Sequence, residues 1–150
     1  MQTLTPPVAP AFNALLVADR VAIDALASAF FAVFCNEGGR ADLSRLAGLC
    51  LPDARIVKAV GAVPECCDLE SFIAPRAALL NGGRLCGFSE REIESRTDVF
   101  GNVAQRWSRY RKCGVLDGVR FEGEGWKSLQ CVRTPQGWRI AAVAWDDVPG

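Results

Sequence analysis

The sequence contains no histidine, and this absence removes several kinds of active site. No imidazole is available to act as a general base near neutral pH, to activate a serine or cysteine nucleophile, or to complete a zinc site with cysteine. The nucleophile motif G-x-S-x-G, the P-loop and the dinucleotide-binding motif G-x-G-x-x-G are missing as well. We therefore expect neither a bound metal nor a cofactor.

An excess of charge of one sign is also lacking, because 17 Lys and Arg residues balance 17 Asp and Glu residues. Such a chain has no long-range field to attract nucleic acid or an anionic membrane. The longest apolar stretch, Val21–Cys35, contains Asp24 and Ser28 and is too short to span a bilayer. The first ten residues have no basic segment and no small-residue cleavage site, so no secretory signal is expected. These features predict a cytoplasmic protein that binds neither nucleic acid nor membranes.

Cysteine is abundant, but its spacing does not match that of a metal site or of a set of disulfide bonds. The seven cysteines include no C-x-x-C pair, their number is odd, and the neighbours Cys66 and Cys67 would form a strained disulfide. Free cysteine commonly behaves as a small buried hydrophobe. We therefore expect free thiols packed in the protein, as is usual in a reducing cytoplasm.

A long amphipathic helix is the strongest local pattern. The 150 residues suit one domain, with an extended tail over residues 1–12 and the domain itself over residues 13–150. From Asn13 to Glu37, apolar side chains recur at steps of three and four, with Asn13 as N-cap and Gly38-Gly39 as the stop. The stripe consists of Ile23, Leu26, Ala27, Phe30, Phe31 and Phe34. It is so wide that we expect a curved sheet to wrap it on several sides.

Two shorter helices and a strand follow before the chain turns to long strands. Asp42 and Asp68 are placed as N-caps, the first of a helix over Leu43–Cys50 and the second of a helix that ends at Asn81-Gly82-Gly83. A strand is expected at Asp53–Val60. The second half predicts four antiparallel strands separated by Gly- and Pro-containing turns, at Phe88–Phe100, Asn102–Cys113, Val119–Thr134 and Gly137–Asp147. Three helices early and four long strands late predict an α+β fold.

Four passages together carry a family resemblance. They are Asp42-Leu43 through Pro52-Asp53-Ala54-Arg55-Ile56-Val57, Phe100-Gly101-Asn102-Val103-Ala104, Ser108-x-Tyr110, and Gly137-Trp138 through Ala144-Trp145. In their order and spacing, across residues 13–147, they resemble the nuclear transport factor 2-like superfamily, which includes SnoaL-like polyketide cyclases and ketosteroid isomerases. The resemblance implies a cystatin-like cone, in which a strongly curved antiparallel sheet wraps around the long N-terminal helix. It also implies a homodimer through the convex sheet face.

The catalytic residues of that superfamily do not carry over to this sequence. In ketosteroid isomerases a carboxylate near the end of the first strand moves the proton, and the first helix carries a phenol. The matching positions here are Lys58 and Phe30 or Phe31, and the absence of histidine removes the dehydratase arrangement of this fold. We therefore expect a pocket without the proton-moving carboxylate. A buried Lys58 is a candidate base, and the alternative is a lysine whose ammonium reaches solvent from the strand edge.

The inward face of the sheet is assigned from alternation. On the strand around residues 99–109 the odd positions Val99, Val103 and Trp107 are apolar, so Gln105 and Arg109 would point inward with them. If the opposite face points inward, the only tyrosine, Tyr110, becomes a hydrogen-bond donor there. The charged residues of the preceding strand share one face, which we expect in solvent or at a dimer interface; they are Glu90, Glu92, Glu94, Arg96 and Asp98.

An aromatic pocket with a few polar contacts is the expected ligand site. We predict as its lining Phe30, Phe34, Lys58, Gln105, Trp107, Arg109, Trp126 and Trp145. Arg109 would there face a carboxylate ligand or Asp24. The alternative is that these aromatic side chains form only the core.

Three functions are compatible with these features of the sequence. The first is a nuclear transport factor 2-like domain that binds a small hydrophobic or carboxylate-bearing molecule in the cone pocket. The second is a SnoaL-like isomerase, cyclase or dehydratase that uses a carboxylate or Lys58. The third is a dimeric protein-interaction module, which the apolar residues on both faces of the later strands favour.

Overall fold

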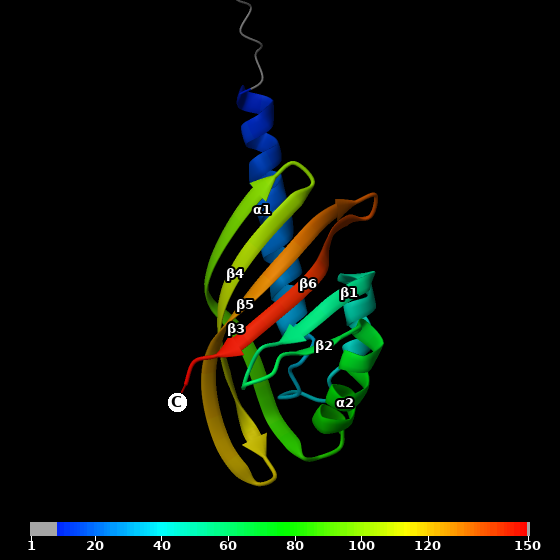
Figure 1. The fold of residues 1–150 in the computed structure, drawn as a ribbon, viewed down its shortest axis with the longest axis vertical. Helices are drawn as coiled ribbons and strands as arrows, with labels where there is room; N and C mark the ends of the chain where they lie inside the picture. The colour runs from blue at the N-terminus through cyan, green and yellow to red at the C-terminus, as the bar shows by residue number, and fades with distance from the viewer. Residues whose placement is uncertain (1–8, 150) are drawn as a thin grey trace, which may run out of the picture.

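The described part of the chain forms one long helix, one shorter helix, a 3-10 helix and a six-stranded sheet (Figure 1). A computed structural model describes the backbone of residues 9–149 and the side chains of residues 16–149. The elements in chain order are α1 (Ala9–Ala32), the 3-10 helix η1 (Leu43–Gly48), β1 (Cys50–Lys58), β2 (Glu65–Cys67), α2 (Leu69–Asn81), β3 (Leu85–Phe100), β4 (Val103–Leu116), β5 (Val119–Thr134) and β6 (Gly137–Asp147). None of these helices is long and apolar enough to cross a membrane.

The predicted α+β fold with a strongly curved sheet is confirmed. The strand order is β2-β1-β6-β5-β4-β3, and β3, β4 and β5 bend visibly around α1 (Figure 1). All neighbouring strands are antiparallel except β1 and β6, which pair in parallel, with Ile56 opposite Val143. The parallel pair and the short strand β2 were not predicted, because both depend on partners far away in the sequence.

Helix α1 buries the predicted apolar stripe. All six of its members, Ile23, Leu26, Ala27, Phe30, Phe31 and Phe34, are buried in the core. The helix begins at Ala9, so the predicted extended tail is wrong for residues 9–12, where Pro10 is tolerated in the first helical turn. Residues 1–8 of that tail lie outside the described residues.

The end of α1 is set by a side chain rather than by Gly38-Gly39. The helix stops at Ala32, and Asn36 lies beyond it with its amide nitrogen 2.8 Å from the Leu80 carbonyl and 2.7 Å from the Leu85 carbonyl. The Phe88 N–H donates to Asn36 Oδ1 at 2.6 Å. Asn36 therefore joins the chain after α1 to α2 and β3, and this requires the helix to end early.

Of the three predicted N-caps, Asp42 and Asp68 are confirmed, whereas Asn13 is wrong because α1 already begins at Ala9. Asp42 Oδ1 accepts from the Ser44 N–H at 3.2 Å, and Asp68 Oδ1 accepts from the Ser71 N–H at 2.8 Å. The helix after Asp42 is a 3-10 helix, and β1 begins at Cys50, three residues before the predicted strand. The capping residues can thus be predicted from the local sequence, whereas the type of a helix and the length of a strand also depend on packing.

The predicted inward face of β4 is wrong. The even residues Ala104, Arg106, Ser108 and Tyr110 are buried, while Trp107 on the odd face is 46% exposed. Gln105 and Arg109 share that outer face, and so does Trp126, which pairs with Arg109 on β5. The apolar residues of β4 predicted the wrong inward face because the true inner face carries polar residues whose partners come from other elements.

The predicted outward face of β3 is wrong for its first two glutamates. A register shift between Glu92 and Glu94 in the β3–β4 ladder marks a β-bulge, which displaces the alternation by one residue. Glu90 and Glu92 consequently point to the interior, as does Thr97 beyond the bulge.

Two ion pairs, each with one buried member, connect α1 to the sheet. Arg133 of β5 donates to both oxygens of Asp19 at 2.7 Å, and Trp138 Nε1 donates to Asp19 Oδ1 at 3.2 Å. The hydrogen bond from Arg133 is the main cause that lowers the pKa of Asp19. The second pair involves Arg106, and together the two hold the middle of α1 against β4, β5 and β6.

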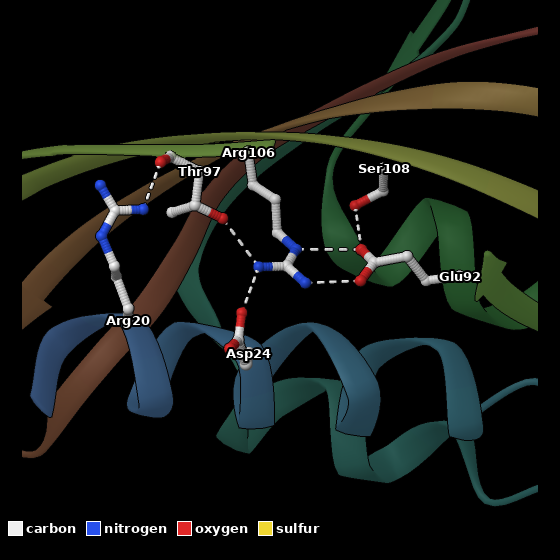
Figure 2. A network of polar contacts seen from close by, with 6 residues as sticks. All are labelled: Arg20, Asp24, Glu92, Thr97, Arg106 and Ser108. Carbon is white, nitrogen blue, oxygen red and sulfur yellow. Dashed lines mark hydrogen bonds and ion pairs between the residues drawn. The ribbon is translucent and has the colours of Figure 1, made fainter. Parts of the chain in front are cut away.

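Figure 2 shows the second pair, a network in which Arg106 of β4 lies between α1 and β3. Arg106 is 4% exposed and donates to both oxygens of Glu92, at 2.9 and 2.5 Å. Its Nη1 donates to Asp24 Oδ1 at 2.6 Å and to Thr97 Oγ1 at 2.7 Å. Ser108 donates to Glu92 as well. Asp24 therefore pairs with Arg106 and not, as predicted, with Arg109, whose partners are Glu124 and Glu94.

Candidate functional site

A cavity opens on the concave side of the sheet, between the end of α1, helix α2 and strands β3 to β6. Its volume is about 380 Å³, within the range of small-molecule sites. It is lined by Phe30, Phe34, Lys58, Val60, Phe72, Arg76, Leu79, Leu80, Leu85, Phe88, Glu90, Tyr110, Lys112, Leu116, Phe121, Lys127, Trp145 and Asp147.

Half of the predicted lining lies at this cavity. Phe30, Phe34, Lys58 and Trp145 line it. Gln105, Trp107, Arg109 and Trp126 lie on the other side of the sheet, where the Trp107 and Trp126 rings meet edge to face with centroids 6.5 Å apart. The alternative in which the opposite face of β4 points inward is the correct one, since Tyr110 lines the cavity.

Aromatic rings form one wall of the cavity. Phe72 of α2 packs edge to face against Phe34 at 5.9 Å and against Trp145 of β6 at 6.0 Å between ring centroids. Phe30 packs in the same way on Phe34 at 5.4 Å. These edge-to-face contacts fix the ring orientations. These aromatic side chains therefore belong to the core and also line the cavity. The two alternatives, a pocket lining and a core, are both correct for them.

All three lysines of the sequence line this cavity, namely Lys58, Lys112 and Lys127. Among the fourteen arginines only Arg76 joins them, with its guanidinium carbon 3.8 Å from the centroid of the Phe72 ring. Burial lowers the pKa of Arg76. Against these four cations stand two anions, Glu90 and Asp147, so the lining carries a formal charge of +2.

Lys127 and Glu90 form the most buried ionic pair of the cavity. Their side chains are 8% and 10% exposed, and Lys127 Nζ lies 2.8 Å from Glu90 Oε1. The approach lacks the direction of a hydrogen bond, and Glu90 Oε1 accepts no hydrogen bond from the residues that the structure describes. The Lys127 ammonium also lies 4.3 Å from the centroid of the Tyr110 ring and 4.6 Å from that of Trp145. Burial lowers the pKa of Lys127, against the opposing effect of Glu90.

A second polar group holds Tyr110 in place. Its hydroxyl donates to Asp147 Oδ1, which also accepts from Lys112 Nζ at 3.1 Å. Burial, followed by the hydrogen bond with Asp147, raises the pKa of the Tyr110 phenol. Burial alone would raise the pKa of Asp147, but the hydrogen bonds from Tyr110 and Lys112 lower it overall. Tyr110 therefore stays a neutral donor near neutral pH.

Gly125 makes room for that phenol. A Cβ at this position would lie 2.1 Å from Tyr110 Oη and 2.5 Å from the Asp146 carbonyl oxygen, and both distances are too short for any side chain. The glycine is thus required because the tyrosine of β4 crosses the neighbouring strand to reach Asp147 on β6.

The expectation of a pocket without a carboxylate is wrong. Glu90 and Asp147 both line the cavity, and alternation missed Glu90 because the bulge after it leaves no mark in the sequence. Lys127 carries a signal that was available, because a lysine at the inward position beside Leu129 and Cys131 interrupts an otherwise buried run. Arg76 and Phe72 lie on α2, whose place beside the cavity cannot be derived from local sequence.

Neither a family model nor a curated protein matches this chain. Solved structures do. A nuclear transport factor 2-like superfamily protein from Salmonella enterica serovar Typhimurium is 14% identical with a TM-score of 0.75, and the match covers 90% of this chain and 94% of that one. A nuclear transport factor 2-like protein with a cystatin-like fold from Novosphingobium aromaticivorans is 17% identical with a TM-score of 0.73, covering 99% and 94%.

A protein from Kribbella flavida is similar to this chain as well, at 18% identity and a TM-score of 0.72, with 89% and 93% of the two chains covered. At these identities the likeness establishes the fold and not the activity. The predicted nuclear transport factor 2-like, cystatin-like fold is therefore confirmed.

Proposed function

We propose that this nuclear transport factor 2-like domain binds, in its cone cavity, a small molecule with an apolar ring and a carboxylate. The observation that carries the proposal is the formal charge of +2 on a lining that is otherwise largely aromatic and aliphatic. Rings favour a flat apolar body, and uncompensated cations in a sheltered cavity favour an anion.

Two cations of the cavity are available to a ligand. Lys112 is engaged with Asp147 and Lys127 with Glu90. Lys58 of β1 and Arg76 of α2, by contrast, form no ion pair with the residues that the structure describes. The guanidinium carbon of Arg76 lies 3.8 Å from the ring centroid of Phe72 and 5.6 Å from that of Trp145. A guanidinium held in this way offers two parallel donors to a carboxylate beside the aromatic wall.

The expected result is that para-methylbenzoate binds and that its neutral isostere para-methylbenzamide binds much more weakly. Arg76→Met should lower the affinity for the acid by about 10- to 100-fold, because a charge-assisted hydrogen bond contributes about 1.5–3 kcal/mol. Isothermal titration calorimetry measures both. The matched control is Arg84→Met, which removes an exposed arginine paired with Asp117 outside the cavity. Equal affinity for acid and amide, or unchanged affinity in Arg76→Met, would contradict the proposal.

An enzyme of the isomerase, cyclase or dehydratase type is the second candidate, and the buried carboxylate of Glu90 in the cavity favours it. Such an enzyme moves a proton from carbon, so a bound substrate would exchange a carbon-bound hydrogen for deuterium in heavy water. Exchange that is lost in Glu90→Gln while binding persists would distinguish catalysis from binding alone.

We also propose that the outer face of the sheet joins two copies of the chain. Trp107 and Val103 of β4 are exposed there, and Ile93 at the bulge of β3 is exposed too. Exposed apolar residues of this kind typify interfaces, including those of a protein-interaction module. The free thiols of all seven cysteines suit the reducing cytoplasm as the location.

Trp107→Arg is expected to weaken self-association by about 30-fold or more, because a buried interfacial tryptophan typically contributes 2 kcal/mol or more. Analytical ultracentrifugation over a range of concentrations measures the effect. Val63→Arg places the same side chain at an exposed position in the loop between β1 and β2 and should leave association unchanged. A wild-type chain that sediments as a monomer at every concentration would refute the dimer.

A further inference from the structure

We propose that Lys127 is a reactive amine that captures a carbonyl group of a ligand in this cavity as a Schiff base, with Glu90 as the proton carrier. The site would act on the small molecule proposed above, and to that extent it rests on the proposed function. What it adds is a covalent step and a second recognised group, an aldehyde or ketone.

The distribution of basic residues supports this role for lysine. The chain uses arginine at fourteen positions and lysine at three, and all three lysines line the cavity. An arginine side chain does not lose its proton in proteins, whereas a lysine does so readily when it is buried. The cavity is therefore the part of the chain where the basic side chains include amines that can deprotonate.

The geometry sets Lys127 apart from the other two. It is 7% exposed, and its Nζ faces the rings of Tyr110 and Trp145 at 4.3 and 4.6 Å from their centroids. Lys112 donates instead to both oxygens of Asp147, at 3.1 and 3.0 Å. Lys58 lies near the end of β1 and is partly exposed. Only Lys127 combines full enclosure with a position on the cavity wall.

Glu90 pairs with Lys127 and is still able to accept a hydrogen bond from a ligand. Its side chain is nine-tenths buried, lines the cavity, and has an oxygen, Oε1, that accepts no hydrogen bond from the described residues. A buried carboxylate oxygen without a hydrogen bond is rare and calls for an explanation. A hydroxyl formed on a ligand next to Lys127 would supply the donor, because Oε1 is 2.8 Å from Nζ.

The charged groups around Lys127 act in both directions on its amine. Glu90 on β3 and Asp147 on β6 favour the ammonium, while Lys112 on β4 opposes it. Burial is the largest effect, and the pKa of Lys127 is lowered overall. A lowered pKa provides the neutral amine that attacks a carbonyl carbon.

The step balances without any further reactant. The Lys127 ammonium passes a proton to Glu90, and the neutral amine attacks the carbonyl carbon while the carbonyl π pair moves to oxygen. Transfer of a proton from nitrogen to that oxygen gives a carbinolamine. The nitrogen lone pair then expels the hydroxyl group, which leaves as water with the proton of Glu90. The products are a protonated imine on Lys127, one water and the Glu90 carboxylate, so the ion pair at the site is preserved.

Reductive trapping tests this site. The wild-type protein is incubated at neutral pH with para-formylbenzoate and cyanoborohydride, digested, and analysed by mass spectrometry for the modified lysines. We expect Lys127 to be labelled at least about tenfold faster than Lys58 and Lys112, because burial lowers the pKa of Lys127 and so raises its fraction of neutral amine. In guanidinium chloride, where the cavity is lost, the three lysines should be labelled equally.

Variants and a second ligand keep the outcomes distinct. Lys127→Arg should lose the adduct, Lys58→Arg and Lys112→Arg should retain it, and Glu90→Gln should slow labelling at least about tenfold. Equal labelling of the three lysines in the folded protein, or no labelling of Lys127, overturns the Schiff-base site. If para-methylbenzoate still binds in that case, the proposed binding function stands and only the covalent step fails. If para-methylbenzoate does not bind, the carboxylate proposal fails by itself, whatever is found at Lys127.

Discussion

Arg106→Leu is expected to lower the free energy of unfolding by about 3–5 kcal/mol, the range found when one member of a buried ion pair is removed. The leucine leaves the Glu92 carboxylate, only 18% exposed, without the guanidinium that contacts both of its oxygens. Thr97 loses its donor as well. The remaining contact of Glu92, the Ser108 hydroxyl, is neutral and cannot compensate the buried charge.

The measurement is urea denaturation followed by far-ultraviolet circular dichroism, compared with two other variants. Asp24→Asn removes the other carboxylate of the network, whose side chain is 63% exposed, and should cost no more than about 1 kcal/mol. The double variant Arg106→Leu/Glu92→Leu removes both buried charges and should recover much of the loss. A single variant as stable as the wild type would show that Glu92 does not depend on Arg106 as the counter-ion of a buried charge.

Lys127→Met is expected to destabilise the protein by a similar amount, about 3–5 kcal/mol, because Glu90 is left as a buried carboxylate without a counter-ion. Methionine keeps the length of the aliphatic chain against Tyr110 and Trp145 and removes only the charge. The loss therefore reports the electrostatic part of the contact rather than a cavity.

Denaturant unfolding of three variants checks this result. Glu90→Gln/Lys127→Met removes both charges and should restore most of the stability of the wild type. Lys112→Met, in the more exposed pair with Asp147, should cost about 1 kcal/mol or less. If Lys127→Met and Lys112→Met were equally stable, the Glu90–Lys127 pair would not be the desolvated one.

Much of this fold could be predicted from the sequence because the signals are local. The stripe of α1 follows from helical periodicity, and the caps at Asp42 and Asp68 follow from side-chain chemistry within three residues. The four long strands are marked by their turns. The parallel contact of β1 with β6 joins residues some ninety positions apart, and no local pattern encodes such a pairing.

The site was predictable only in part, for a physical reason. Alternation equates apolar with inward, and that rule succeeded for Trp145 but failed for Trp107, which lies on the outer face. Inside the cone, Arg106 and Ser108 are stable because carboxylates from other elements pair with them. From the sequence alone, a polar residue is predicted to be exposed, even when a residue far along the chain pairs with it in the interior. The alternation rule therefore assigned the inner and outer faces of β4 the wrong way round.

The two ion pairs of α1 lie on the N-terminal side of the residues that line the cavity. Asp19 and Asp24 are tied to the sheet, while Phe30, and Phe34 just beyond the helix, face the hollow. The orientation of the helix and the shape of the cavity are thereby determined by different residues. Ligand preference is then free to diverge through substitutions at the phenylalanine end, with the scaffold inherited unchanged.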